Sequence, residues 1–335
     1  MLLEGSSSPS RQPRSIGAGK GNTGVNHYSV FGLQAVSEIP LPELRTHDPA
    51  EAPDVVVRRG PVEVAGAAPG LNVLSETEAL LVIPAVGRYL MRQGREMIVE
   101  GEPGGSERNL RLYLLGSAFA AILHQRGLLP LHANSILVED RAIGLMGHPG
   151  AGKSTMAACF HDRGFGILSD DVCVVGPGPV AFAGIPRLRL WREALEASGR
   201  NVDGYEMSFD DMDKYNVPIA QGEAGPEQAP LSHLYLLDDA GGSDEAAIVR
   251  LRGAAAVEAL VANTYRGAYV PLMGLTREHL VACVKLAGEA PVFRVSRRWG
   301  LEMLADQAEA IAAHARSVIS ERGSSRADQA GGKEG

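Results

Sequence analysis

Residues 147–154 are the stretch of the chain whose residue types and spacing are best suited to chemistry. They read G-H-P-G-A-G-K-S and match the phosphate-binding pattern G-x-x-x-x-G-K-[ST] at every fixed position. The glycines let successive backbone N–H groups turn toward phosphate oxygens, where a Cβ at several of these positions would clash. We therefore predict a P-loop (Walker A motif) that binds a nucleotide through Gly147, His148, Pro149, Gly150, Ala151, Gly152, Lys153, Ser154 and Thr155.

The last residues of this loop supply the groups that a nucleoside triphosphate requires. Lys153 would place a positive charge against the β- and γ-phosphates, and the Ser154 hydroxyl would be a ligand of Mg²⁺. A helix that begins here would direct its positive end at the anion. ATP and Mg²⁺ are therefore the expected cofactors.

The segments around the loop predict how an acid pair reaches it. Residues 142–146 are a short apolar run typical of a buried strand, and residues 154–163 have the pattern of a helix that ends before Gly164. A second apolar strand, 165–169, leads directly into Asp170 and Asp171. In a right-handed βαβ unit both parallel strands end at the same edge of the sheet, so the two carboxylates are expected beside the phosphates.

A histidine upstream of the loop is expected at the same edge. His132 precedes the strand-like residues 133–138, which turn through residues 139–141 into the strand before the P-loop. A hairpin of this kind would bring His132 back near the phosphates. A single histidine in such a place is more often structural, but together with the P-loop and the acid pair it favours a catalytic role.

This arrangement resembles the catalytic domain of the HPr kinase/phosphorylase family, and most closely the HPr-kinase-like serine kinases associated with lasso peptide biosynthesis. The resemblance is specific over roughly residues 110–220. It implies an α/β fold with a P-loop nucleotide-binding domain of the HPr kinase/PEP carboxykinase type. It also implies that Asp170 is the base on an acceptor serine hydroxyl, that His132 lies beside the phosphoryl group, and that Ser154 holds Mg²⁺. Our own hypothesis adds that Asp171 supports the metal or a water molecule.

Three basic residues downstream of the acid pair are further candidates for contacts with substrate or phosphate. Arg187 and Arg189 are expected on a loop, where they would be either solvated or bound to a phosphate or a substrate carboxylate. In the family a basic residue near position 214 approaches the nucleotide, and Lys214 is the candidate here. A Glu-Ile-Arg-Gly motif of the bifunctional HPr kinases is missing from this region, so the resemblance does not carry over the phosphorylase activity.

Composition agrees with an enzyme in a reducing cytoplasm. The 335 residues allow one large or two modest domains, and the formal net charge of −8 argues against a nucleic-acid binder. Three widely separated cysteines show no metal or redox spacing. The most apolar window, 112–123, is too short to span a bilayer, and we see no secretory signal, so we expect a cytoplasmic protein.

Changes in amino-acid composition and in the pattern of apolar residues divide the chain into four segments. Residues 1–26 are rich in Ser, Gly, Pro and Arg and are expected to be a disordered tail, and residues 27–106 contain short strand-like runs typical of a small β-rich domain. Residues 107–322 would form the catalytic domain, opened by an amphipathic helix over 107–126 that bridges the two domains. Residues 323–335 are expected to be a polar, disordered tail.

The leading hypothesis is an ATP-dependent serine kinase. Its acceptor would be a serine of a small protein or peptide, possibly at the C-terminus of a lasso precursor, with no nucleic-acid or membrane partner and with self-association into a homo-oligomer left open. The alternatives are a non-catalytic ATP-binding regulatory module and a small-molecule P-loop kinase. A carboxykinase would need more metal ligands near the loop than the sequence offers.

Overall fold

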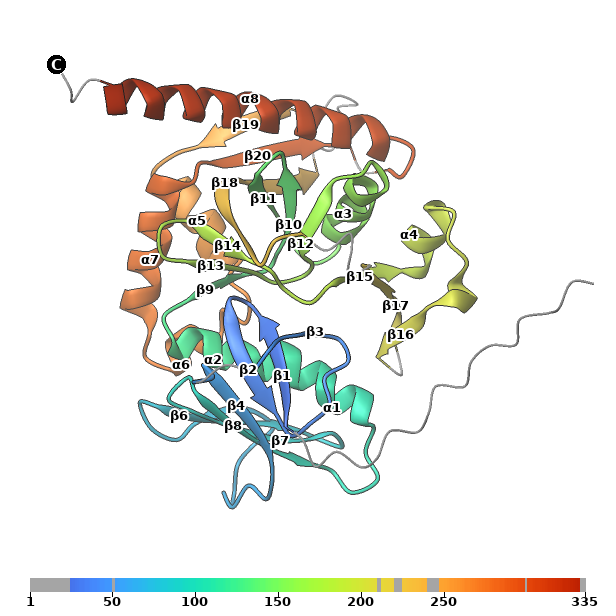
Figure 1. Ribbon diagram of the computed structural model, residues 1–335, viewed down its shortest axis with the longest axis vertical. Helices are drawn as coiled ribbons and strands as arrows, with labels where there is room; N and C mark the ends of the chain where they lie inside the picture. Colours follow the sequence, from blue (N-terminus) through green and yellow to red (C-terminus); the bar gives the residue numbers. More distant parts are fainter. Residues whose placement is uncertain are drawn as a thin grey trace, which may run out of the picture.

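Two β-sheets with a long helix between them form the framework of the molecule (Figure 1). The computed structural model describes residues 25–49, 52–209, 212–219, 225–239, 247–298 and 300–331. The predicted N-terminal tail lies outside the described residues up to residue 24, and so do residues 332–335 of the predicted C-terminal tail.

The first sheet contains eight strands in the order β3-β1-β2-β4-β8-β7-β6-β5 and corresponds to the predicted β-rich domain. Its strands bury alternate side chains, as in β2, because successive residues of a strand point to opposite faces. The strands are β1 (Asn26–Val30), β2 (Leu33–Ser37), β3 (Arg45–Thr46), β4 (Val55–Arg59), β5 (Gly70–Val73), β6 (Glu78–Ile83), β7 (Gly87–Arg92) and β8 (Glu96–Gly101).

The predicted amphipathic helix is present and packs against this first sheet. It runs as α1 (Glu107–Tyr113), one π-helical turn η1 (Leu114–Ala118) and α2 (Phe119–Gln125), and the Ser106 side chain caps its first turn. Its buried residues, including Leu114 and Phe119, belong to the same core as Tyr89 of β7. The first sheet and the helix α1–η1–α2 therefore form one unit, which we call the first unit. Its core extends past the predicted domain boundary at residue 106.

The β1–β2 turn fastens the first unit to the second sheet. The Phe31 N–H donates to the Ala183 oxygen (2.8 Å), and Gly32 adopts φ +75° directly against the Phe182 ring. A Cβ on Gly32 would lie 2.4 Å from Phe182 Cδ1, closer than any real contact, so only glycine fits this turn.

We therefore expect Gly32→Ala to destabilise the protein by about 2–4 kcal/mol, from left-handed backbone strain plus overpacking against Phe182. The measurement is the free energy of unfolding in urea. Gly66→Ala is the matched control, because Gly66 also has a positive φ (+71°) but no atom within 4 Å of its Cβ position. Equal losses for the two variants would show that the contact with Phe182 is unimportant.

The second sheet has nine strands and carries the predicted P-loop, residues 147–154. Its main path is β12-β10-β11-β18-β14-β13-β9, and β20 pairs with both β18 and β19. The strands are β9 (Leu129–Leu131), β10 (Ala133–Val138), β11 (Arg141–Met146), β12 (Gly166–Ser169), β13 (Cys173–Gly176), β14 (Val180–Phe182), β18 (Gln228–Asp239), β19 (Ala247–Leu251) and β20 (Val292–Arg297).

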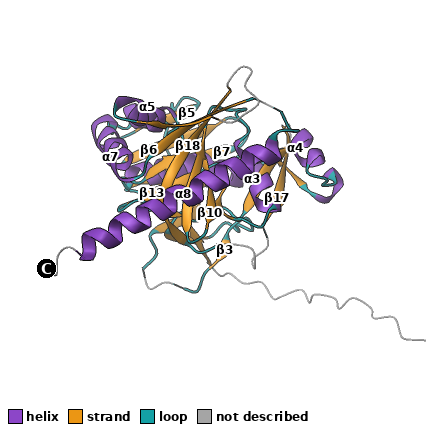
Figure 2. Ribbon diagram, turned by 90° about the horizontal axis from the view of Figure 1, so that it is seen from above, coloured by secondary structure: helices purple, strands orange, loops and turns teal. Residues whose placement is uncertain are grey.

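Helices cover this sheet, and two of them share a core with its strands. Figure 2 shows α8 (Leu304–Gly331) crossing the molecule close to α3 (Lys153–Asp162), and Ile311 and Phe160 of these helices pack with Ile143 of β11. The remaining helices are α5 (Ala254–Ala262), α6 (Tyr269–Leu272) and α7 (Thr276–Glu289). No helix within the described ranges is both long and apolar enough to span a membrane.

The predicted tail from residue 323 requires a correction, because α8 continues to Gly331. Residues 324–330, S-S-R-A-D-Q-A, contain neither proline nor glycine, and a single glycine at 323 lowers helix stability by only about 1 kcal/mol. A glycine near the end of a helix is therefore not always its stop.

A small third sheet projects beside the P-loop. Its strands are β15 (Arg187–Trp191), β17 (Met212–Pro218) and β16 (Glu206–Phe209), in the order β15-β17-β16. Helix α4 (Arg192–Ala197) and the 3₁₀ turn η2 (Val202–Gly204) connect β15 to β16. The prediction of a loop at residues 187–189 is wrong: R-L-R-L alternates with period two, and Leu188 and Leu190 are buried on one face, which leaves Arg187 and Arg189 together on the other.

Candidate active site

The hairpin and the βαβ unit predicted from the sequence are both present. In the β10–β11 hairpin Ala133 pairs with Met146, so His132 lies next to the start of the loop. Strand β12 pairs antiparallel with β10, which pairs antiparallel with β11; β12 and β11 therefore run parallel and end at the same edge. His132, the P-loop and the acid pair meet at this edge.

The P-loop has the backbone that its glycines predict, although for two different reasons. A Cβ on Gly147 would lie 2.9 Å from Ala151 Cβ and 3.0 Å from the Leu237 oxygen, so this position excludes a side chain by contact. At Gly150 no atom lies within 4 Å of the Cβ position, and the requirement there is the positive φ of +88°. Helix α3 begins at Lys153, directly after the loop.

Two residues far away in the sequence hold the loop in place. Asn263, just after α5, accepts a hydrogen bond from the Gly147 N–H through its Oδ1 (2.9 Å). Arg297, at the end of β20, donates from Nη2 to the Ala151 oxygen (2.8 Å). Neither residue could be identified from the sequence, because neither stands in a motif or near one.

Lys153 is buried within the loop. Its Nζ donates to the Gly147 oxygen (2.7 Å) and the His148 oxygen (3.2 Å), and only 7% of the residue is exposed. Burial lowers the pKa of Lys153 to about 8, because desolvation disfavours the charged ammonium. The side chain is therefore positive at neutral pH and loses its charge in mildly alkaline solution.

We expect ATP affinity to fall as the pH rises through about 8, because unliganded Lys153 is then neutral and must take up a proton to hold phosphate. The loss should reach about tenfold near pH 9, because the cost of protonating Lys153 grows by about 1.4 kcal/mol for each pH unit above its pKa. Calorimetry from about pH 7 to about pH 9 measures it, with Lys153→Arg as the control, since a guanidinium stays charged over this range. An affinity that is constant across this range would contradict the assignment.

Asp170 faces inward and is fully engaged by the surrounding residues. Its Oδ1 accepts from Asn134 Nδ2 (2.6 Å) and Ser154 Oγ (3.1 Å), and its Oδ2 accepts from the Arg189 N–H (2.7 Å). Burial, and next the charge of Asp171, raise the pKa of Asp170 above its usual value. Asn134 was not predicted, although a buried asparagine within an apolar strand was a signal that could have been used.

Asp171 has a different environment, since it lies against cationic and aromatic groups. Its carboxylate pairs with Arg189, its Oδ1 is 3.7 Å from His132 Nδ1, and its backbone has φ +70°. Burial alone would raise the pKa of Asp171, but the positive charge of the Arg189 guanidinium outweighs burial and holds that pKa below its usual range. Asp171 is therefore ionised at neutral pH.

His132 is held in one orientation. Its Nδ1 is 3.1 Å from the Asp171 backbone oxygen, which can only accept, so this nitrogen carries the hydrogen. The ring stacks on Tyr265 with centroids 6.0 Å apart. Burial lowers the pKa of His132, so the imidazole is neutral at neutral pH and Nε2 is left as an acceptor.

Two cavities meet at these residues. The first, which we call the P-loop cavity, has about 520 Å³. Its lining includes Trp191, Lys214 and the loop residues Gly150, Gly152, Lys153, Ser154 and Thr155. The second, which we call the inner cavity, has about 680 Å³ and lies between the first unit and the second sheet. Both are lined by His132, Pro149, Asp171 and Arg189.

The three predicted basic residues all lie at this site. Arg189 lines both cavities, Lys214 lines the P-loop cavity and Arg187 lines the inner cavity. Together with Lys153 they set four cationic side chains against the carboxylates of Asp170 and Asp171. The site therefore has an excess of positive charge, as a polyphosphate requires.

The residues around Ser154 fit a magnesium ion. Its hydroxyl and the Asp170 carboxylate lie 3.1 Å apart, and both are oxygen ligands of the kind that Mg²⁺ prefers. Within the part of the chain that the structure describes, no group of three or more His, Cys, Asp or Glu could hold a metal. Phosphate oxygens would thus have to complete the coordination, as is usual for Mg²⁺ bound with a nucleotide.

Comparison with known proteins yields a distant likeness among solved structures. No protein-family model matches the chain, and no curated protein matches it. Among solved structures it is similar to the Hpr(Ser) kinase/phosphatase from Coxiella burnetii, with 10% sequence identity and a TM-score of 0.32, over 57% of this chain and 98% of that chain. A likeness of that extent transfers no residue roles, so function has to be derived from the site itself.

Proposed function

We propose that this chain is an ATP-dependent kinase that transfers the γ-phosphoryl group to a serine hydroxyl of a peptide or small protein. One observation carries the proposal: Asp171, His132 and Arg189 line both the P-loop cavity and the inner cavity. A nucleotide in the first cavity and an acceptor in the second would meet across these three side chains. In-line phosphoryl transfer needs such an arrangement.

In this proposal Asp171 orients the acceptor. The serine oxygen forms a bond to the γ-phosphorus, the bond from that phosphorus to the β–γ bridging oxygen breaks, the serine proton passes to the Asp171 carboxylate, and ADP leaves. Asp171 is ionised and lies on the wall between the cavities, which suits this role. The Arg189 guanidinium would stabilise the charge of the transferring group, and neutral His132, whose Nδ1 hydrogen is donated to the Asp171 backbone oxygen, would hold Asp171 in position.

The roles proposed for the two acids are thus the reverse of those that the family resemblance implies. Asp170 has both oxygens engaged by Asn134, Ser154 and the Arg189 N–H, which suits a carboxylate that orients the metal ligand Ser154. Bound at Ser154 and Asp170, Mg²⁺ would neutralise charge on the phosphates. Lys153 and Lys214 would hold the phosphates from the other side of the P-loop cavity.

The finer identity of the acceptor is also part of the proposal. A C-terminal serine of a lasso precursor is the acceptor that the resemblance implies. A small-molecule acceptor is the second candidate, because the inner cavity, at about 680 Å³, falls in the size range of small-molecule sites. An ATP-binding module without catalysis would have no need of Asp171 and His132 on the wall shared by two cavities.

The test is transfer of label from γ-labelled ATP in the presence of Mg²⁺, with HPr, a lasso precursor peptide ending in serine, and free serine as acceptors. Label on a peptide or protein serine supports the kinase, and label on free serine alone supports the small-molecule alternative. ATP binding without any transfer would leave the non-catalytic module. Wild-type protein is compared with Lys153→Ala in each arm.

A further inference from the structure

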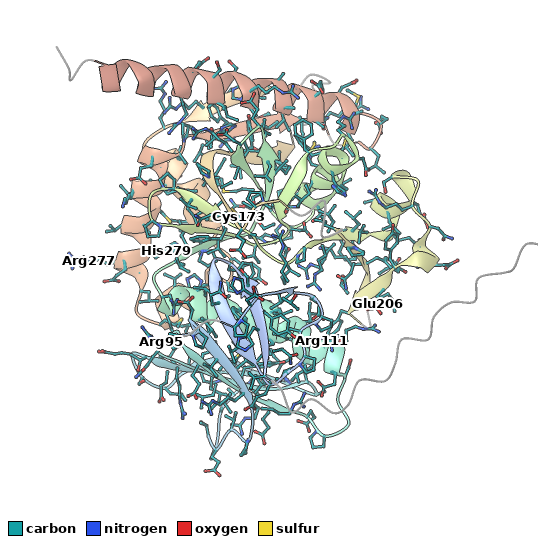
Figure 3. All side chains as sticks on the ribbon, viewed as in Figure 1. Arg95, Arg111, Cys173, Glu206, Arg277 and His279 are labelled. Atoms are coloured by element: carbon teal, nitrogen blue, oxygen red, sulfur yellow. The ribbon has the colours of Figure 1, made fainter. Side chains whose placement is uncertain are left out.

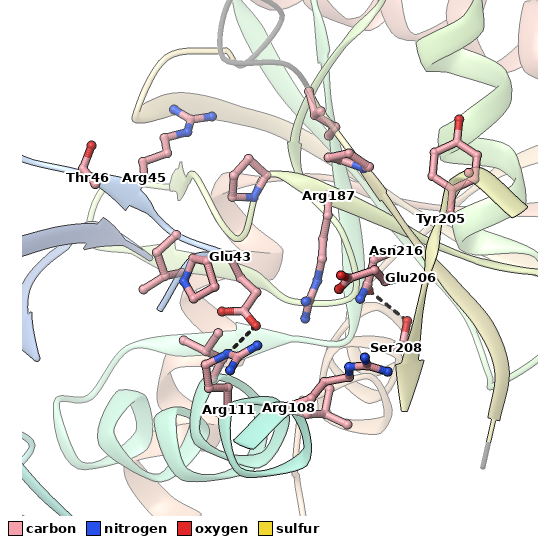
Figure 4. Close-up of a pocket in the computed structure, with 18 residues that line it drawn as sticks. Glu43, Arg45, Thr46, Arg108, Arg111, Arg187, Tyr205, Glu206, Ser208 and Asn216 are labelled. Atoms are coloured by element: carbon pink, nitrogen blue, oxygen red, sulfur yellow. Dashed lines mark hydrogen bonds and ion pairs between the residues drawn. The ribbon is translucent and has the colours of Figure 1, made fainter. Parts of the chain in front are cut away.

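A third cavity adjoins the candidate active site, and its side chains carry an excess of positive charge. It has about 650 Å³ and lies between helix α1, the segment 42–46 before and within β3, and the β16–β17 hairpin (Figure 4). We call it the arginine groove, after four of the charged residues that line it, Arg45, Arg108, Arg111 and Arg187; the two acidic ones are Glu43 and Glu206.

Part of this charge is satisfied within the chain. Arg111 Nε pairs with Glu43 Oε1 (2.8 Å), and Arg45 Nη1 donates to the Gly225 oxygen (3.0 Å). The guanidinium of Arg187 is different: among the described residues it has no hydrogen-bond or ion-pair partner. Burial, and next the charge of Arg189, lower the pKa of Arg187 to about 10, which still leaves it positive at neutral pH.

An unpaired cation in a partly desolvated site is costly, and an anionic ligand would offset that cost. The planar guanidinium matches a carboxylate in particular, because two N–H donors can bind its two oxygens. In Figure 4 the Arg187 side chain extends into the groove between Glu43 and Glu206, toward the side from which Arg108 and Arg111 approach. The groove is thus suited to an acidic ligand.

The groove leads to the reacting groups. Arg187, Ser208, Leu112 and Leu115 line both the groove and the inner cavity, and the inner cavity is also lined by Asp170 and Asp171. A ligand that extends along the groove would therefore end beside the acid pair. Arg187 stands at the junction of the two cavities.

Two strand edges with which no strand of the described residues pairs flank the groove. Strand β3 is an end strand of the first sheet and β16 is an end strand of the third, and Arg45, Thr46, Glu206 and Ser208 of these strands line the cavity. Edge strands offer backbone N–H and C=O groups with which an extended peptide can pair. A nucleic acid would gain nothing from these edges and would meet a chain with net charge −8.

We propose that the arginine groove binds an extended, acidic peptide segment that adjoins the acceptor serine, with Arg187 holding a carboxylate close to the reacting centre. This inference rests on the proposed kinase function, because only a kinase has an acceptor serine. It adds the chemical class of the substrate. Either an Asp or Glu side chain or the C-terminal carboxylate of a peptide supplies the same chemistry.

The test measures peptide binding in the absence of nucleotide. Fluorescein-labelled peptides with one serine flanked by glutamates are compared with twins that carry glutamine instead, each with a free or an amidated C-terminus. We expect the glutamate peptide to bind about tenfold or more tighter than its twin, as for a charge-assisted contact, and the difference to shrink with added salt. A preference that depends only on the free C-terminus would identify the terminal carboxylate as the group bound.

Substitutions of single arginines show which residues are responsible for the preference for the carboxylate peptide. Arg187→Gln and Arg108→Gln should each reduce the preference for the carboxylate peptide, with the larger loss at Arg187. Arg277→Gln should leave it unchanged, since Arg277 is an exposed arginine of α7 on the far side of the molecule from Arg111 and Glu206 (Figure 3). Equal binding of all four peptides to the wild-type protein would overturn the inference without recourse to any variant, and so would an unchanged preference in folded Arg187→Gln.

Failure of this inference can be distinguished from failure of the proposed function. Lys153→Ala should retain the peptide preference and lose transfer. If the wild-type protein preferred the acidic peptide but transferred no phosphoryl group, the proposed peptide binding in the groove would be supported and the proposed kinase activity would be contradicted. Equal binding of the glutamate and glutamine peptides, with phosphoryl transfer to both at equal rates, would support the kinase and contradict the proposed role of the groove.

Discussion

Lys153→Ala is expected to abolish phosphoryl transfer, with a loss in kcat on the order of 10³-fold, the scale for removing one positioned charge at a reacting centre. Lys153 is the cation of the loop itself, and its Nζ already lies within the loop, where it donates to the Gly147 and His148 oxygens. ATP affinity should fall as well, by about ten- to hundredfold for a lost charged hydrogen bond.

The measurements for this variant are the rate of label transfer and the dissociation constant for ATP. Lys285→Ala serves as the matched control, because Lys285 is an exposed lysine of α7, outside the residues that line either cavity. Transfer that continued in Lys153→Ala at the wild-type rate would place the nucleotide somewhere other than the P-loop cavity.

Asp171→Asn and Asp170→Asn are expected to fail in different ways. Asp171→Asn should lower kcat by about 10²–10⁴-fold, the range for a lost general base, while ATP affinity stays nearly unchanged. Asp170→Asn should instead raise the Mg²⁺ concentration needed for half-maximal ATP binding, because Ser154 loses the carboxylate that orients it.

The two variants are compared by transfer rate, ATP affinity and Mg²⁺ dependence in parallel. The side chain of asparagine has nearly the shape of aspartate, so packing around the buried pair is preserved. If Asp170→Asn abolished transfer with normal Mg²⁺ dependence while Asp171→Asn remained active, the roles implied by the family resemblance would apply and our assignment would be withdrawn.

Much of the site could be predicted because its signals are local. The P-loop is a contiguous pattern, and the hairpin before it follows from two apolar runs joined by a polar turn. The parallel arrangement of β11 and β12 follows from the handedness of a βαβ unit. These relations involve residues within about forty positions of one another, and backbone geometry alone decides them.

Other predictions failed or were incomplete where a local pattern was ambiguous. The glycine and proline before β15 favour a loop, whereas the period of two in its R-L-R-L residues indicates the strand that is present. Gly323 favours a helix end, whereas α8 continues to Gly331. In both places the residues that follow the glycine or proline decide the structure.

The sequence alone predicts a phosphate-binding loop, an acid pair and a histidine, and it also predicts the edge of the sheet at which they meet. The contacts between distant elements become known only from the tertiary structure. Asn263 and Arg297 hold the loop through hydrogen bonds, and Ser154 contacts Asp170 rather than Asp171. Arg187 lines a separate groove. The physical reason is that strand and helix periodicity sets which way a backbone runs, whereas hydrogen bonds between distant side chains depend on how whole elements pack. Two adjacent aspartates are equivalent in a sequence, and they differ only once one of them is turned toward Ser154 and Asn134 and the other toward Arg189 and His132.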